Sequence, residues 1–271
     1  MALLAISDLH VGYASNRAAL SLVPHHPADW LILAGDIGET IEHLELTLDA
    51  LGPKFARLVW VPGNHELWTR RSEPGLAGVA KYQALVEACR RRNVLTPEDP
   101  YPLYVGRDRA VRVAPLFVLY DYSFAPSPMS PTEAVAWAVD QGVLCSDEAV
   151  LWPDPYTTRA AWCAARCEET ERRLAEARAL DAHPMVLINH FPLRREHVLV
   201  PQFPAFALWC GTERTRDWPA RFGATEVVYG HLHMPGTKLE GGVRYHEVSL
   251  GYPGQWNARQ GIDQRLRIIT E

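Results

Sequence analysis

The first third of the chain alternates short apolar runs with longer stretches in which apolar residues recur at helical spacing. The short runs predict strands at Leu3–Ser7, Trp30–Ala34 and Leu58–Val61. The longer stretches predict helices at Asn16–Val23, Glu39–Leu51 and Leu76–Arg92. Strands that alternate with helices indicate an α/β fold built on a parallel or mixed sheet.

The middle of the chain, about residues 101–180, follows a different pattern. Val111–Tyr120 reads as a long strand, and the Pro-rich stretch Asp121–Pro131 separates it from a helix at Thr132–Gln141. A second helix is predicted at Thr157–Leu180. The Pro-rich pieces are too long for simple connectors, and long ordered loops in compact domains are often functional. We expect this insertion to form a cap around the mouth of a site.

The last third returns to strands. Apolar runs predict strands at Met185–Asn189 and Glu226–Gly230, and the Gly241-Gly242 pair joins Lys238–Glu240 to Val243–Val248 as a β-hairpin. The sequence contains no internal repeat, low-complexity tract or linker. We therefore expect one domain over residues 1–271.

Composition narrows the choice of partner and compartment. The chain has 271 residues, of which 48% are hydrophobic, which is enough for a large core. A net charge of −5 and no basic run longer than Arg90–Arg92 argue against a nucleic acid polymer as partner. No apolar segment approaches the ~20 residues of a membrane span. The five cysteines are irregularly spaced, so we expect a cytoplasmic protein without a disulfide framework. The sequence leaves the oligomeric state open.

Five polar motifs follow predicted strands from one end of the chain to the other. Because strand ends gather the active site of an α/β fold, these side chains are expected to lie together. The motifs are Asp8-Leu9-His10, Gly35-Asp36, Gly63-Asn64-His65-Glu66, Asn189-His190 and Gly230-His231-Leu232-His233.

The residue types in these motifs suit two metal ions. Asp8 and His10 are two positions apart, as are His231 and His233, and alternate residues at a strand end point the same way. Mixed oxygen and nitrogen ligands favour Mn or Fe, with Zn also possible, over Mg or Ca. The Asp36 carboxylate has two oxygens and can bridge two ions. Each motif alone is common in turns, and only their conjunction predicts a dinuclear site that hydrolyses phosphate esters.

The order of these motifs resembles the calcineurin-like metallophosphoesterase family. The resemblance implies a sandwich of two mixed β-sheets flanked by helices, and attack on a phosphodiester by a hydroxide that bridges two divalent metals. It also implies that His65 contacts the phosphate and protonates the leaving group. By position, it assigns the first metal to Asp8, His10 and His233, the second to Asn64, His190 and His231, and the bridge to Asp36.

Four further segments resemble one branch of that family, whose members remove 4′-phosphopantetheine from a carrier-protein serine. These segments are Trp60–Trp68, Leu119–Phe124, Leu208–Thr212 and Ser249–Pro253. They carry aromatic residues that either pack in the core or contact a substrate. The candidate substrate contacts are Trp68, Tyr122, Trp209 and Tyr252, together with Arg194 from a possible basic patch.

Two other functions compete with this one. A phosphodiesterase or phosphatase acting on a nucleotide or another small phosphorylated metabolite would need the same metal site. The acidic net charge favours it weakly, because carrier proteins are themselves acidic. Arg194 and Arg195, with Arg214, Arg216 and Arg221, would offset that charge if they formed a basic patch near the mouth of the site. A third hypothesis is a non-catalytic scaffold that keeps the fold without the reaction. Such a protein usually loses metal ligands, and no ligand position is missing here.

Overall fold

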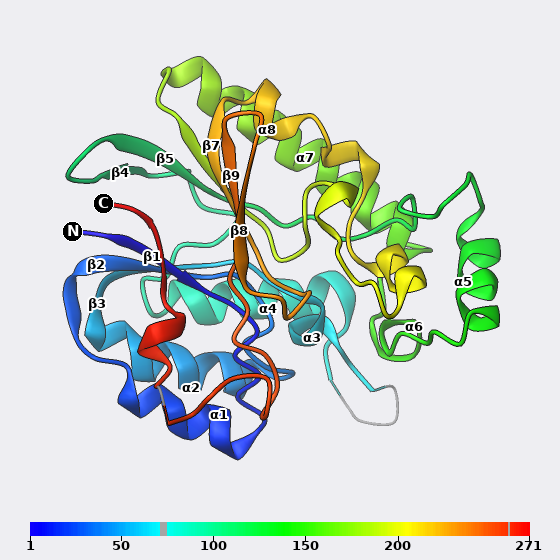
Figure 1. Ribbon diagram of the computed structural model, residues 1–271, viewed down its shortest axis with the longest axis horizontal. Coiled ribbons are helices and arrows are strands. Elements are labelled where there is room, and N and C mark those ends of the chain that lie inside the picture. The colour runs from blue at the N-terminus through cyan, green and yellow to red at the C-terminus, as the bar shows by residue number, and fades with distance from the viewer. Residues whose placement is uncertain (71–74, 260) are drawn as a thin grey trace.

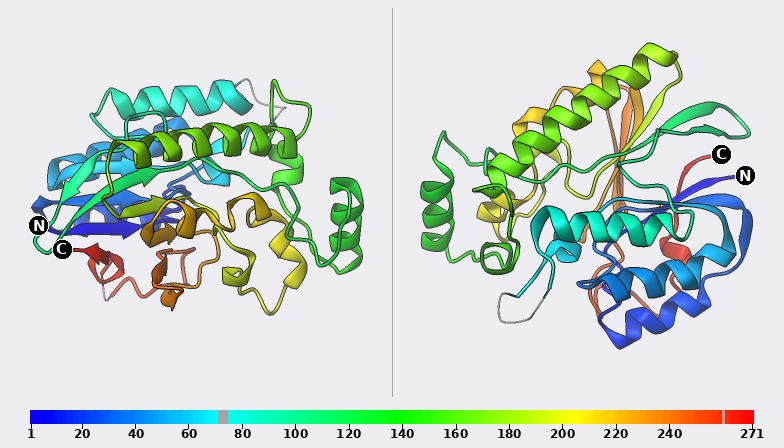
Figure 2. Two further views of the ribbon diagram at one scale, coloured as in Figure 1. Left: turned by 90° about the horizontal axis from the view of Figure 1, so that it is seen from above. Right: turned by 180° about the vertical axis from the view of Figure 1, so that it is seen from behind.

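The fold is a sandwich of two β-sheets with helices on its outer faces, as Figures 1 and 2 show. The computed structural model describes residues 1–70, 75–259 and 261–271. The smaller sheet has the order β10 (Arg267–Thr270), β1 (Leu3–Ile6), β2 (His26–Leu33), β3 (Phe55–Trp60). The larger sheet has the order β4 (Leu103–Val105), β5 (Ala110–Pro115), β6 (Met185–Ile188), β7 (Ala224–Tyr229), β9 (Val243–Glu247), β8 (Gly236–Glu240).

Both sheets are mixed. Strands β1, β2 and β3 run parallel, with β10 antiparallel at the edge beside β1. In the larger sheet β5, β6, β7 and β9 run parallel, and β4 and β8 pair antiparallel at its two edges. The expected two mixed sheets flanked by helices are confirmed.

Eight α-helices are seen in the described part of the chain. In Figure 1, α1, α2 and α4 lie along the smaller sheet, and α7 and α8 lie along the larger one. Their bounds are α1 (Ala14–Ala19), α2 (Ile41–Leu51), α3 (Asn64–Leu67), α4 (Gly78–Arg90), α5 (Pro131–Asp140), α6 (Asp147–Val150), α7 (Arg159–Leu180) and α8 (Trp218–Arg221). None of them combines the length and apolar character needed to cross a bilayer.

Alternation along the strands builds two cores. Leu3 and Ala5 of β1 belong to the cluster between the sheets, whereas Leu4 and Ile6 belong to the larger cluster that includes the helices. Successive side chains of a strand point to opposite faces, so one apolar run serves both cores. This explains why the strand-forming runs are continuously apolar instead of alternating with polar residues.

The predicted strand at Val111–Tyr120 is too long. Strand β5 ends at Pro115, and residues 116–120 continue as buried chain outside the sheet. There Val118 N donates to Asn189 Oδ1 at 3.0 Å instead of to a neighbouring strand. The apolar character of this run therefore reflects burial, which a strand and a buried irregular segment share. Strands β4 and β10 carried no pattern that predicted them.

Residues 101–180 contribute in part to the sandwich and in part to a segment beside the polar loops. Strands β4 and β5 belong to the larger sheet, and α7 lies against its outer face. The part between them, residues 116–158, carries α5 and α6, and we call it the cap segment. Helix α5 stands away from the body in both views of Figure 2. Its start is fixed locally, since Ser130 N donates to Glu133 Oε2 at 2.8 Å in a capping box.

Candidate metal centre

The loops that follow five parallel strands converge at one end of the sandwich. They lead from β1, β2, β3, β6 and β7 into the five motifs. Backbone hydrogen bonds tie these loops together, from Asp8 N to Gly35 O at 2.9 Å and from Gly230 N to His190 O at 2.9 Å. Within each sheet the carboxyl ends of the parallel strands meet at one edge, and the packing of the two sheets brings the edge of β1, β2 and β3 beside that of β6 and β7.

Five candidate ligands have left-handed backbone conformations. The φ angles are 54° for Asp8, 43° for His10, 53° for Asp36, 72° for His231 and 54° for His233. Non-glycine residues rarely adopt positive φ, and each instance costs on the order of 1 kcal/mol or more. The i, i+2 pairs thus reach the site through turned backbone, and the strand alternation assumed from sequence is not the reason.

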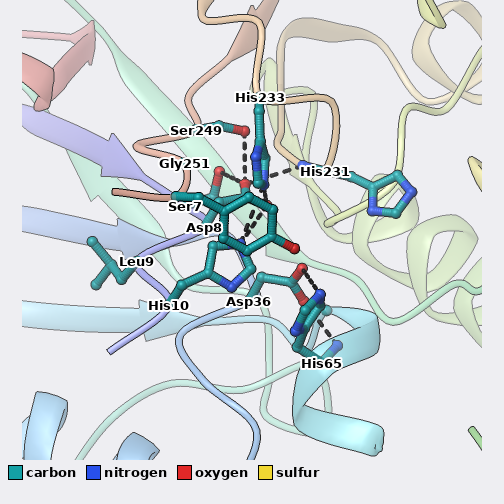
Figure 3. A network of polar contacts seen from close by, with 12 residues as sticks. Ser7, Asp8, Leu9, His10, Asp36, His65, His231, His233, Ser249 and Gly251 are labelled. Carbon is teal, nitrogen blue, oxygen red and sulfur yellow. Dashed lines mark hydrogen bonds and ion pairs between the residues drawn. The ribbon is translucent and has the colours of Figure 1, made fainter. Parts of the chain in front are cut away.

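Asp8, His10 and His233 form the first cluster (Figure 3). Their ligand atoms lie within 4.8 Å of one another. His233 Nε2 is 3.1 Å from Asp8 Oδ1 and 3.2 Å from His10 Nε2. One carboxylate oxygen and two imidazole nitrogens thus face a common point, as ligands of one cation would.

Asp36, His190 and His231 form a second cluster with the same spread of 4.8 Å. His190 Nε2 lies 3.4 Å from Asp36 Oδ2. Asn64 Oδ1, His190 Nε2 and His231 Nε2 are buried and make no hydrogen bond within the described residues. Leaving a buried polar atom unpaired costs about 1–3 kcal/mol. Three such atoms in one place fit a bound divalent cation, which would satisfy them together.

A surrounding layer of hydrogen bonds leaves the ligand atoms free. Asp8 Oδ2 accepts from Ser7 Oγ at 2.6 Å and from Ser249 Oγ at 2.7 Å, so Oδ1 remains available. The other ring nitrogens of the histidines are also engaged, His190 Nδ1 with Ala34 O at 2.9 Å and His233 Nδ1 with Gln255 Oε1 at 2.8 Å. Such contacts set ring orientation and tautomer, and leave each Nε2 for a metal.

Glu66 lies fully buried beneath the loops. Its carboxylate accepts from Asp36 N at 3.0 Å, Ile37 N at 2.8 Å and Gly63 N at 2.9 Å. Burial, with the charge of Asp36, raises the pKa of Glu66 to about 7. A methyl group at Gly63 would overlap the Asp36 carboxylate, which is why glycine stands there. Glu66 therefore holds the second and third motifs in register.

Asp147 reaches the site from helix α6 of the cap segment. Its Oδ1 accepts from Asn64 Nδ2 at 3.0 Å and from Trp68 Nε1 at 2.6 Å. The first bond fixes which end of the Asn64 amide faces the second cluster. Burial raises the pKa of Asp147. Sequence reasoning missed this residue, because no motif marks a lone aspartate 83 positions away from its partner.

His65 lies between the two clusters, with a ring nitrogen within 4.8 Å of ligand atoms of His10 from the first and Asp36 from the second. Its Nε2 is 3.7 Å from Asp36 Oδ2, and its ring stacks on Trp68 with centroids 3.6 Å apart. On the other side, Nδ1 lies 3.9 Å from Glu39 Oε1. Burial, stacking and two carboxylates therefore hold the His65 ring at the edge of the metal cluster.

The pKa values of the histidines in the two clusters depend on the nearby carboxylates of Asp8 and Asp36. Burial disfavours the charged forms, but Asp36 outweighs it at His190 and raises the pKa of His190 to about 10. In the same way, Asp8 raises the pKa of His233 to about 9. Burial and the charge of His190 lower the pKa of His231 to about 3. Without metal, His190 and His233 are therefore protonated at neutral pH, so each cluster contains one positively charged imidazolium where a cation would bind.

Two of the predicted substrate contacts border a cavity beside the clusters. Trp68 and Tyr252 line it, together with Asp36, His65 and His231. The Tyr252 ring also stacks on His10, with centroids 4.4 Å apart. These two aromatic side chains are therefore placed where a bound phosphate ester could touch them.

The other three predicted contacts lie away from that cavity. Tyr122 and Trp209 both donate to Glu148 Oε1, at 2.9 and 2.8 Å, and both are buried. Arg194 pairs with Glu240 at 2.9 Å. The structure therefore does not bring these three side chains to the metal clusters, and it gives them structural partners instead.

The possible basic patch is also neutralised in large part. Arg214 lies 3.8 Å from Asp121, and Arg216 pairs with Glu196. Arg195 is exposed and donates to Ala125 O at 3.0 Å. The acidic partners of Arg194, Arg214 and Arg216 could not be seen from the arginine positions alone.

Comparison with known proteins places this site in a family. Residues 1–235 match the family described as Calcineurin-like phosphoesterase. The chain belongs to this family, and it is a hydrolase that acts on phosphoric ester bonds. Members of the family use a dinuclear divalent metal site, which agrees with the two clusters.

The chain is also similar to individual members of known function or structure. A Mycobacterium tuberculosis protein named acyl-carrier-protein phosphodiesterase PptH is 46% identical, over 98% of this chain and 83% of the relative. The crystal structure of Phosphopantetheinyl Hydrolase (PptH) from Mycobacterium tuberculosis superposes with a TM-score of 0.92, covering 99% of this chain and 95% of that one. A Thermus thermophilus protein at 15% identity and a TM-score of 0.50, covering 91% of this chain and 88% of the other, shares the fold alone.

Proposed function

We propose that this chain is a dinuclear metal-dependent phosphodiesterase that releases 4′-phosphopantetheine from a carrier-protein serine. The observation that carries the proposal is the TM-score of 0.92 with Phosphopantetheinyl Hydrolase over 99% of this chain. The substrate is taken from this Mycobacterium tuberculosis relative, and the two clusters support the chemistry. The free thiols of all five cysteines agree with a cytoplasmic location.

We assign the ligands from the two clusters and from the free atoms in them. Asp8, His10 and His233 would hold one cation and Asn64, His190 and His231 the other, with Asp36 between them. Each cluster mixes oxygen with imidazole nitrogen, which suits Mn or Fe and also Zn. The hydrogen bonds to Ser7, Ser249 and Gln255 would keep this arrangement rigid.

Residues around the metal site would have separate roles in the reaction. Two divalent cations would supply a hydroxide nucleophile near neutral pH and positive charge for phosphate oxygens. His65 would donate the proton that the leaving oxygen needs, an effect of about 10²–10⁴ in rate. Asp36 and Glu39 lie on either side of its ring and would hold it in place. Trp68 stacks on the same ring and would help to fix its orientation.

The test compares three substrates with the Mn-loaded protein. They are a holo-carrier protein, bis-p-nitrophenyl phosphate and p-nitrophenyl phosphate. The expected result is loss of the phosphopantetheine mass from the carrier, together with slower turnover of the small diester. Cleavage of the small diester without any change of the carrier would reject the carrier protein and leave a small-molecule phosphodiesterase. Absence of turnover with all three would favour a non-catalytic scaffold.

A further inference from the structure

The cavity beside the metal clusters continues onto an apolar wall. It has a volume of about 500 Å³, within the range of small-molecule sites. Val143 and Leu144 of the cap segment line one part of it, and Val200, Phe203 and Phe206 line another. The two parts come from segments about 60 residues apart, and helix α5 packs against the 3₁₀ helix Pro204–Trp209 that carries Phe206.

Phe206 links this wall to the metal centre. Its ring stacks on the ring of His231, with centroids 5.4 Å apart and an interplanar angle of 18°. A group bound to the phosphate at His231 would therefore pass directly onto an aromatic face. The apolar wall is thus continuous with the catalytic end of the cavity.

Two large apolar side chains of this wall are exposed to solvent. Leu144 is 80% exposed and Phe203 is 59% exposed. Exposed apolar surface that borders a polar site marks a place where a ligand or partner covers it. Because both residues also line the cavity, what covers them would be a ligand that extends out of the metal centre.

The residues that line the cavity restrict how much negative charge the ligand can carry away from the metal clusters. Among the described residues that line the cavity, none is a lysine or an arginine. A second phosphate, such as a nucleotide diphosphate carries, would find no cation beyond the metal clusters. The side-chain hydroxyls of Ser146 and Tyr252, for which the described residues provide no hydrogen-bond partner, can instead pair with neutral amides.

We infer that this cavity binds the uncharged pantetheine part of the substrate, a chain of methylene, dimethyl and amide groups that hangs from the scissile phosphate. The inference rests on the proposed function and adds the residues that select the substrate. Leu144, Phe203 and Phe206 would cover the methylene and dimethyl groups. Ser146 and Tyr252 would face the amides. A small diester such as bis-p-nitrophenyl phosphate has no such chain and would gain nothing from this wall.

The test separates the arm from the carrier protein by using the p-nitrophenyl ester of 4′-phosphopantetheine, which bears the arm alone. The measured quantity is the ratio of its kcat/KM to that of bis-p-nitrophenyl phosphate. For Leu144→Ser and Phe203→Ser the ratio should fall about tenfold each, because an apolar contact is lost. Leu180→Ser, on a residue that is 77% exposed at the end of α7, is the matched control and should keep the wild-type ratio.

Three other results would overturn the inference. Equal ratios in the wild type and both variants would show that the wall does not touch the arm. Slower cleavage of holo-carrier with an unchanged arm ester would assign Leu144 and Phe203 to the carrier's surface instead. If the wild-type protein cleaves bis-p-nitrophenyl phosphate but neither arm-bearing substrate, the proposed function itself falls and the inference with it.

Discussion

The carboxylate of Asp147 accepts a 3.0 Å hydrogen bond from the side-chain amide of Asn64, so the cap segment contacts a candidate ligand beside the second metal cluster. The same oxygen accepts from Trp68 Nε1, which stacks on His65. One buried carboxylate therefore fixes both a candidate ligand and the aromatic support of the candidate proton donor. The cap segment is thereby linked to the metal centre through Asn64 and Trp68.

Replacing Asp147 should weaken metal binding at the second cluster. Asp147→Ala frees the Asn64 amide to rotate, and loss of such an outer contact costs about 10–100-fold in metal affinity. Metal content after dialysis against weak chelator, measured by mass spectrometry, should fall towards one ion per chain. Asp147→Asn keeps an acceptor oxygen and should retain more metal. Two tightly held ions in a folded Asp147→Ala protein would contradict this role.

Removing the metals should lower thermal stability. The unpaired atoms of Asn64, His190 and His231 and the left-handed ligand backbones cost free energy that metal binding offsets. A ligand at 1,000 times its Kd stabilises by about 4 kcal/mol. Chelation should therefore lower Tm by roughly 10 °C, and added Mn²⁺ should restore it. An equal Tm with and without metal would show that the clusters are complete without ions.

Metal binding should release protons, and apparent affinity should rise with pH. In the metal-free protein the pKa values of His190 and His233 are raised to about 10 and about 9, so both rings are protonated at pH 7. A metal binds the neutral imidazole, so one proton must leave each ring. Below these pKa values, each released proton makes the apparent metal affinity rise by about tenfold per pH unit. Calorimetry in two buffers of different protonation enthalpy counts the protons. His233→Gln should release one fewer, whereas equal counts would refute the assignment.

Loss of Glu66 should destabilise the whole protein. Glu66→Ala leaves three buried backbone N–H groups without an acceptor, at about 1–3 kcal/mol each. Urea unfolding should show a loss of at least 3 kcal/mol. Glu66→Gln keeps one acceptor oxygen and should lose less. Glu87→Ala, on a glutamate that is 60% exposed on α4, should change stability by under about 0.5 kcal/mol.

Replacing His65 should slow the reaction according to the leaving group. His65→Asn removes the proton donor but none of the proposed ligands, so metal content should stay at the wild-type level. Turnover of a carrier serine ester, whose alkoxide leaves poorly, should fall by about 10²–10⁴. Turnover of bis-p-nitrophenyl phosphate should fall much less, because p-nitrophenolate leaves without a proton. Equal losses with both substrates would assign His65 to phosphate binding alone.

Much of the site could be predicted from sequence because its parts are local. Asp8, Asp36, Asn64, His190 and His231 each follow an apolar strand within a few residues. Parallel strands end at one edge of their sheet, which gathers the motifs within each sheet, and the packing of the two sheets then brings the two groups together. Their roles as ligands, and the prediction of one domain over residues 1–271, stay predictions.

The remaining parts depended on contacts between distant residues. The pairing of Asp147 with Asn64, the ion pair of Arg194 with Glu240 and the left-handed turn at Asp36 have no signature in spacing or composition. The sequence by itself determined the fold class and the donor set, because burial periodicity and strand-end positions are properties of short segments. Only the tertiary structure decided which polar side chains are held by partners and which remain free, because hydrogen bonds and ion pairs form between segments that only folding brings together.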